Sequence, residues 1–268
     1  METIGAEAAV SRRDRLLEQA ALPVLGVAAL FAVWALVAGS GLATEQFLPG
    51  PMAVLREILT LVHEPYAGSL LQAHLLASLQ KFGAAFLLGA GLGVPLGLMM
   101  GRFKPVEHIV GPVFEGLRFI PPIAWVPFSI LWLGTGFMAP VMVIFAGVFS
   151  SCVVNAYAGV KQADKSIIEA AQMLGISRWA TVTEVLVPAA LPHIVAGLRI
   201  GAGFGWQSLI GAELIVGSTG LGYMIVQGES NLTAKVVIAG MIVIGVVGAI
   251  IDLIMRKIEH RIRSRWTR

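Results

Sequence analysis

The chain has 268 residues, of which 57% are hydrophobic and 13% are charged, and its formal net charge is +3. A soluble domain would carry about 25% charged residues, so the composition excludes an ordinary soluble globular protein. The apolar residues fall in long blocks, which predicts an all-α integral membrane protein. The only cysteine, Cys152, excludes a disulfide framework and is expected in the core.

Six apolar segments are candidates for membrane spans, each of which needs about 20 residues. They cover approximately residues 22–39, 82–100, 119–133, 137–155, 193–216 and 236–255. The first follows three arginines but has no clear small-residue cleavage site, so we expect a retained span rather than a signal peptide. The third is short, and its start could lie earlier, near Val110.

Lysine and arginine fall unevenly on the two sides of a six-span chain. Three precede the first span, three follow the second, three follow the fourth and six follow the last, fifteen in all. The opposite side has three, which are Arg56, Lys81 and Lys235. Basic loops stay inside, so we expect a bacterial cytoplasmic-membrane protein with both termini in the cytoplasm. The predicted tails are residues 1–21 and 256–268.

The loop after the first span, residues 40–73, is expected outside. It contains PGPMAVLREILTLVHE, in which Val54, Ile58 and Leu61 recur at helical spacing. This pattern predicts a helix lying on the outer surface, and the alternative is a simple polar loop. Residues 22–69 therefore form a unit of one span and one interfacial helix.

Two spans carry glycine at every fourth position, which gives each a smooth ridge that another helix can approach closely. The ridges consist of Gly89, Gly93, Gly97 and Gly101 in the second span and Gly197, Gly201 and Gly205 in the fifth. They fit packing inside one subunit, or a subunit interface or sliding surface. Pro95 interrupts the second span and is expected to kink it.

The cytoplasmic stretch EAAQMLGISRWATVTEVLVPAALP, residues 169–192, contains signals for a first short helix. Ser166 and Glu169 have the spacing of a capping box, so the helix is expected to begin there. Gly175 stands where the helix should end, in a left-handed conformation that glycine adopts at low cost.

A second short helix is predicted over residues 178–186. Ser177 can cap its start, and Pro188 is expected to stop it. Two short helices joined at a glycine would bury one side against the membrane domain and leave a knob in the cytoplasm. Such a knob fits a docking element for another protein or an ordinary interfacial loop.

The same stretch resembles the EAA motif of the membrane subunits of type I ABC importers. Glu169-Ala170-Ala171, Gly175 and the Leu186-Val187-Pro188 ending match at the motif's spacing. Further stretches are similar to the nitrate, sulfonate and taurine branch of that family, and the resemblance covers about residues 70–255. These stretches are HLLASLQKFGAAF (74–86), PPIAWVPFSILWLGTG (121–136), NAYAGVKQADKSIIEAAQMLG (155–175), PAALPHIVAGLRIG (188–201) and AELIVGSTGLGYMI (212–225).

The resemblance implies a permease subunit for a small anion such as nitrate or a sulfonate. Two copies would form the pore, two cytoplasmic ATPase subunits would bind ATP and magnesium, and a solute-binding protein would deliver the solute. The loop between spans four and five would be the coupling segment. Its residues would be Glu169, Ala170, Ala171, Gly175, Arg178, Leu186 and Pro188.

The residues themselves agree with this division of labour, because the sequence has no phosphate-binding loop of the form G-x-x-x-x-G-K-[ST]. A channel or secondary transporter would place ionisable residues in mid-membrane, and few are found. A membrane enzyme would need a catalytic constellation. The histidines have no metal-ligand spacing and no nucleophile elbow occurs, so no catalytic, metal or nucleic-acid site is predicted.

Four residues within the spans are candidates for a translocation path. Arg199 could attract an anion, although pairing with lipid phosphate or with the coupling loop is the alternative. Glu213 could face a pore or pack between helices. Trp125 and Trp206 could line the path, although tryptophan more often anchors or packs.

Overall fold

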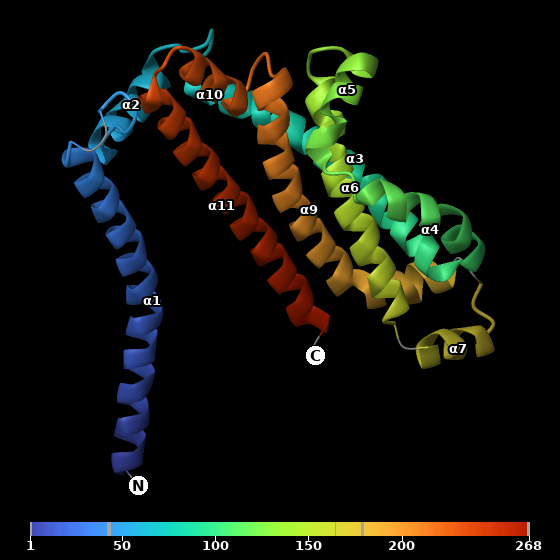
Figure 1. Ribbon diagram of the computed structural model, residues 1–268. Coiled ribbons are helices and arrows are strands. Elements are labelled where there is room, and N and C mark those ends of the chain that lie inside the picture. Colours follow the sequence, from blue (N-terminus) through green and yellow to red (C-terminus); the bar gives the residue numbers. More distant parts are fainter. Residues whose placement is uncertain (1, 42–43, 164, 178–179, 267–268) are drawn as a thin grey trace.

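The computed structural model describes residues 2–41, 44–163, 165–177 and 180–266, and it is helical nearly throughout (Figure 1). The helices in chain order are α1 (Glu2–Gly39), α2 (Pro51–His63), α3 (Leu71–Arg102), α4 (Lys104–Arg118), η1 (Pro122–Trp125), α5 (Val126–Leu133), α6 (Met138–Lys161), α7 (Lys165–Met173), η2 (Thr181–Leu186), α9 (Val187–Val216), α10 (Leu221–Ser230) and α11 (Ala234–Trp266).

The described residues contain five helices that are long and apolar enough to cross a membrane: the Ala21–Gly39 part of α1, α3, α6, the run Thr181–Val216, and α11. A sixth span is formed if α4 is joined to η1 and α5, and these two parts meet at a bend of 94°. The expectation of an all-α protein with about six spans is confirmed.

The prediction of a third span as one apolar segment over residues 119–133 is wrong. The chain leaves the helix after Arg118 and starts again at Pro122. Pro121 has φ −56° and ψ 139°, because a residue before proline is driven out of the helical region and Pro122 follows it. The two prolines therefore break the span.

Helix α3 extends well beyond the predicted apolar segment, because it begins at Leu71. Lys81, which was expected in an outer loop, lies inside this helix and is 3% exposed. The helix also runs through Pro95 to Arg102. Hydropathy identifies only the apolar part of a helix. The predicted span therefore starts at residue 82 and leaves out the polar side chains before it, whose partners are buried.

The predicted outer helix is present as α2. Val54 and Leu61 are buried, and Ile58 packs against the same apolar cluster. The helix contacts α3 and α11, and the Trp34 indole of α1 donates to the carbonyl of Pro49 just before it, at 3.1 Å. Helix α2 thus joins the C-terminal end of α1 to α3 and α11.

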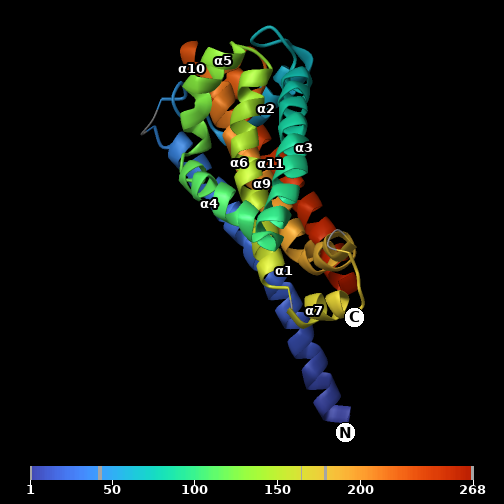
Figure 2. The ribbon, with the colours of Figure 1, turned by 90° about the vertical axis from the view of Figure 1, so that its right-hand side faces the viewer.

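The centre of the fold is α6, which packs along α3 on one side and along α9 on another (Figures 1 and 2). The predicted glycine ridges make both contacts. A Cβ atom at Gly93 of α3 would lie 2.9 Å from the Cβ of Cys152, and one at Gly205 of α9 would lie 2.7 Å from a methyl group of Val148. The ridges therefore serve packing within the chain, and they give no support for a subunit interface.

A buried ion pair joins α3 to the C-terminal end of α9. The ammonium of Lys81 lies 2.8 Å from the carboxylate of Glu213, whose side chain is fully buried. The Ser78 hydroxyl donates to both oxygens of that carboxylate, at 2.9 and 2.8 Å, and the Gly222 amide donates to one of them at 3.0 Å. The carboxylate on α9 thus has partners from two other helices, α3 and α10.

The loop before α10 is held by the same cluster. The Gly220 amide donates to Nδ1 of His74 at 3.2 Å, so the neutral imidazole carries its proton on Nε2, which donates to the Tyr66 carbonyl at 2.9 Å. Gly220 has φ +123°, and a Cβ atom there would collide with the Glu213 carboxylate. Glycine is required at this position for both reasons.

The glycine ridge gives a matched pair of substitutions within α3. Gly93→Val should lower the midpoint of thermal unfolding in detergent, because its side chain overlaps Cys152 and the Phe149 carbonyl, and overpacking costs about 1–3 kcal/mol. Gly91→Val places the same side chain in the same helix with nothing within 4 Å. Equal midpoints for the two variants would contradict the packing role of the ridge.

The buried ion pair gives a second prediction. Glu213→Gln leaves the Lys81 ammonium buried without its counter-charge, which should destabilise the protein by about 3–5 kcal/mol. Adding Lys81→Met removes that charge and should restore part of the loss. Glu45→Gln, which breaks the more exposed pair with Lys235, is the control and should cost about 1 kcal/mol or less. Thermal unfolding of the four proteins tests this, and an unstable double variant would argue against the pair.

Candidate functional sites: the cytoplasmic segment and a mid-membrane hollow

The first candidate site is α7 with the turn that ends it. Gly175 has φ +73°, as predicted, and no atom of the described residues lies within 4 Å of a Cβ atom placed there. The Ile176 amide donates to the Ala171 carbonyl at 3.1 Å, which is the six-residue hydrogen bond of a Schellman motif. Helix α7 begins at Lys165, so Ser166 lies in its first turn rather than before it. The end of the helix was therefore predicted more accurately than its start.

Helix α7 presents apolar side chains to the surroundings. Met173 is 84% exposed and Leu174 is 79% exposed, and Glu169 and Ala170 are also exposed. Ala171 is buried, at 4% exposure, and faces inward. Both views place α7 at the same end of the molecule as the C-terminus of α11 (Figures 1 and 2). The knob expected from the sequence is present, with an apolar tip.

The segment after Gly175 differs from the prediction of a second short helix. The Ala180 amide donates to the Ser177 hydroxyl at 3.2 Å, so Ser177 caps the start as expected. The helix does not stop at Pro188 but continues through η2 into α9 and past Pro192. Arg178 lies outside the described residues.

The reason Pro188 is tolerated lies in the turn before it. Residues Thr181–Leu186 form a π-helix, which is wider than an α-helix, and Pro188 stands in the first turn of α9. A proline needs no hydrogen bond at the start of a helix, and the wider turn displaces the carbonyl with which its ring would clash. Leu186 is fully buried at this junction.

Two of the four candidate pathway residues are held inside the chain. Glu213 belongs to the buried cluster described above. Trp206 is 6% exposed, its indole donates to the Ile244 carbonyl at 3.2 Å, and its ring meets Phe82 edge-on with centroids 5.7 Å apart. Glu213 is buried, and the small exposed part of Trp206 borders a pocket that Arg199 and Asp252 also line.

The other two candidates are partly exposed. The Arg199 guanidinium lies 3.0 Å from the Asp252 carboxylate and 3.0 Å from the Glu259 carboxylate, both in α11. It thus pairs with two carboxylates of its own chain. The partners considered from the sequence were a transported anion, lipid phosphate and the coupling loop. Trp125 is half-buried against the cluster around Val126 and meets Phe128 edge-on.

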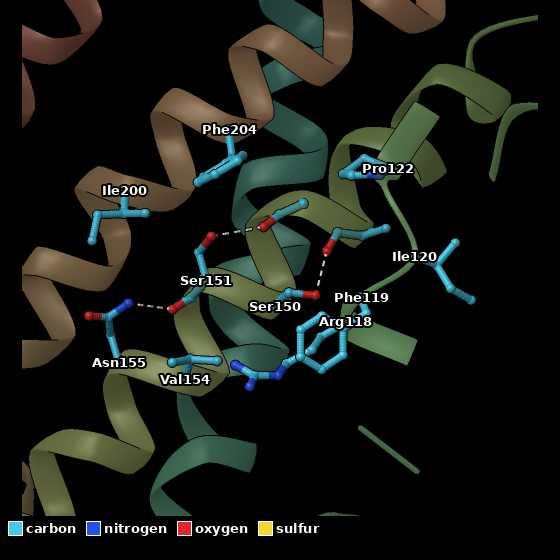
Figure 3. A pocket seen from close by; sticks show the side chains of 12 residues that line it. Arg118, Phe119, Ile120, Pro122, Ser150, Ser151, Val154, Asn155, Ile200 and Phe204 are labelled. Atoms are coloured by element: carbon cyan, nitrogen blue, oxygen red, sulfur yellow. Dashed lines mark hydrogen bonds between the residues drawn. The ribbon is translucent and has the colours of Figure 1, made fainter. Parts of the chain in front are cut away.

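The structure shows a different polar site, which lies between α6, α9 and the break after α4 (Figure 3). This hollow has a volume of about 330 Å³. Its polar lining comes from α6 and from the end of α4. Those polar residues are Arg118, Ser150, Ser151 and Asn155, and the apolar wall includes Phe119, Ile200 and Phe204.

Within the hollow, each polar side chain of α6 bonds to the helix itself. The Ser150 hydroxyl donates to the Ala146 carbonyl at 2.9 Å, and the Asn155 amide donates to the Ser151 carbonyl at 2.8 Å (Figure 3). The Arg118 guanidinium pairs with Glu115 at 2.7 Å and lies over the Phe119 ring, 4.9 Å from its centroid.

Sequence reasoning missed this site because it counted Arg118 among the basic residues that follow the second span on the cytoplasmic side. Arg118 ends a helix that starts at Lys104 and is followed by the break. The sequence does contain a signal, which is the pair Pro121-Pro122 three residues after Arg118. Two prolines indicate irregular backbone, and irregular backbone at membrane depth must line a cavity or be buried in protein.

Comparisons with known proteins agree with the fold. The chain is 36% identical over 248 residues to the taurine transport system permease protein TauC of Escherichia coli (strain K12), covering 92% of this chain and 90% of that protein. It is 30% identical to the nitrate import permease protein NrtB of Synechocystis sp. (strain PCC 6803), covering 88% and 87% of the two chains.

A solved structure has the same fold. A chain of a bacterial alginate ABC transporter, in complex with an alginate-bound periplasmic protein, matches with a TM-score of 0.63 at 18% identity, covering 94% of this chain and 96% of that chain. The model of the family of binding-protein-dependent transport system inner membrane components matches residues 93–264. With its multi-pass helical fold, this chain belongs to that family, as a permease subunit of an ABC importer.

Proposed function

We propose that two copies of this chain form the membrane path of an importer for a small anion. Two ATPase subunits bind ATP and magnesium and dock on the cytoplasmic segment of each copy. A solute-binding protein delivers the anion on the other side of the membrane. We propose an anion as the solute because the two relatives are named for taurine, which is a sulfonate, and for nitrate.

The observation that supports this most directly is the exposed tip of α7. Met173 and Leu174 project as apolar side chains from a helix whose end is fixed by the Gly175 turn. Large exposed apolar side chains beside a cytoplasmic polar helix are typical of a protein contact. Ala171 and Leu186 anchor the other side of the segment in the membrane domain, so a force on the tip acts on α9.

The basic residues support an orientation once Lys81, Arg118 and Arg199 are left out of the count, because these three lie inside spans. Fourteen lysines and arginines then remain on the side of the two termini and of α7, and two, Arg56 and Lys235, remain on the other. This bias supports a cytoplasmic location for both termini.

Two copies are supported by the surface around the broken span. Phe119 is 74% exposed at the break, and Leu131 and Trp132 of α5 are 83% and 76% exposed. The backbone at the break lacks the continuous helical hydrogen bonds that lipid requires. A second copy facing this side would cover it and enclose a path between the two chains.

The coupling role predicts a loss of transport without a loss of insertion. Gly175→Val forces a β-branched residue into a left-handed conformation at a cost of about 1–2 kcal/mol and should tilt the tip of α7. Glu169→Lys reverses an exposed charge beside the tip. Both variants should reach the membrane normally, lose uptake, and retain less ATPase on affinity purification.

Two controls separate coupling from general strain. Gly175→Asn should retain function, because asparagine adopts positive φ more readily than other non-glycine residues. Gly68→Val puts the same strain, at φ +83°, into the outer loop and should leave ATPase retention unchanged. Full uptake and full ATPase retention by both Gly175→Val and Glu169→Lys would refute the coupling role.

The stoichiometry is a separate prediction. The complex purified through a tag on this chain should contain two copies of it and two ATPase chains by native mass spectrometry. The physical reason is the exposed broken span, which a single copy leaves uncovered. One copy paired with a different membrane chain would exclude the homodimer while leaving the importer in place.

A further inference from the structure

The hollow beside α6 lies near the middle of the membrane. Ser150 is twelve residues from the start of α6 at Met138 and eleven from its end at Lys161. At about 1.5 Å per residue, it is roughly 18 Å from one end of the helix and 16 Å from the other. Polar side chains at such a depth are costly beside lipid and usually face a bundle interior or a water-filled cavity.

The break after Arg118 points the same way. Phe119, Ile120 and Pro121 are exposed and non-helical, and Ile120 and Phe119 line the hollow. Irregular backbone at membrane depth occurs only where it is buried in protein or lines an aqueous cavity. The side chains of the hollow and the backbone of the break thus favour the same conclusion, that this face borders the path and not the lipid.

The charge of the hollow suits an anion. Among the residues that the structure describes, its lining contains one guanidinium and no carboxylate. Glu115 holds Nε and Nη2 of Arg118 through one carboxylate oxygen, at 2.8 and 2.7 Å, and the side chains of this pair are 31% and 56% exposed. Such an exposed pair contributes little stability, so Arg118 can exchange Glu115 for another anion.

We propose that this hollow is the site where the transported anion contacts the membrane domain. Arg118 binds the oxygens of a small sulfonate, nitrate or carboxylate in a charge-assisted hydrogen bond. The Ser150 and Ser151 hydroxyls, which now donate within α6, rotate to donate to the same oxygens. A volume of about 330 Å³ is at the lower end of the range for small-molecule sites, which suits a short sulfonate. The assignment of the anion rests on the proposed function.

A thiol-accessibility experiment tests the site without knowledge of the natural solute. In the assembled transporter, Cys152→Ala removes the only cysteine and Ser150→Cys introduces one in the hollow. Membranes are treated with the anionic sulfonatoethyl and the cationic trimethylammonioethyl methanethiosulfonates, with and without ATP. When each rate is divided by the rate of the same reagent with a free thiol, the anionic reagent should react faster than the cationic one.

Arg118 should set this preference. Arg118→Gln should reduce the ratio of anionic to cationic rates by about tenfold, which is the lower range for losing a hydrogen bond to a charged group. Arg118→Lys should retain part of the preference, and Glu115→Gln should keep or increase it. Leu87→Cys, on a 72% exposed position of α3, is the control and should react slowly with both charged reagents.

Uptake of taurine and nitrate by the same variants distinguishes the two proposals. If the unaltered complex imports either anion, Arg118→Gln should raise its KM by about tenfold and leave ATPase retention unchanged. Two results would overturn the proposal of an anion site in the hollow. One is that both reagents modify Ser150→Cys at equal rates and Arg118→Gln does not change this. The other is that neither reagent modifies Ser150→Cys, with or without ATP. If the unaltered complex imports neither taurine nor nitrate while the thiol preference depends on Arg118, the anion-binding hollow stands and the proposed transport of these anions fails.

Discussion

The structure depends on the close approach of α6 to two neighbours at once. In a membrane, helices associate through van der Waals contact and hydrogen bonds, because lipid is as apolar as a leucine side chain. Glycines on α3 and α9 bring both backbones against α6, with Val148 in contact with each ridge. A third side of α6 borders the hollow, and that side carries Ser150 and Ser151. The hollow is thus a consequence of how α6 is packed.

The same packing connects the hollow to the cytoplasmic segment. Helix α6 ends at Lys161 and α7 starts at Lys165, while the return from α7 enters η2 and α9 as one continuous helical run. Leu186 packs with Val160 and Ala190, so the base of the segment is fixed to the ends of α6 and α9. In the proposed coupling, a displacement of α7 would therefore reach two of the helices that line the hollow. The extension of the helix through Pro188 strengthens this coupling, because a stop there would have inserted a flexible joint.

The sequence predicted the parts of the structure that local patterns determine. The long apolar helices, the outer helix α2, the glycine ridges and the positive φ of Gly175 all follow from spacing and residue type. Features that depend on distant partners were predicted poorly. Lys81 and Glu213 are 132 positions apart, and nothing near either residue indicates that they neutralise each other. Pro188 looked like a helix stop because the π-turn that accommodates it has no simple sequence signature.

The two charged sites within the spans show how structural and functional charges differ. Glu213 is fully buried and receives hydrogen bonds from Lys81, Ser78 and the Gly222 amide. A carboxylate with that many fixed donors cannot release one without leaving another group unpaired in a dry interior. Arg118 has one partly exposed carboxylate partner, a cavity beside it, and a broken backbone that lipid cannot cover. An importer must bind its solute and let it leave, so the group that contacts it needs a partner it can exchange. By that criterion Arg118 is suited to transport, whereas Glu213 is suited to holding α10 in place.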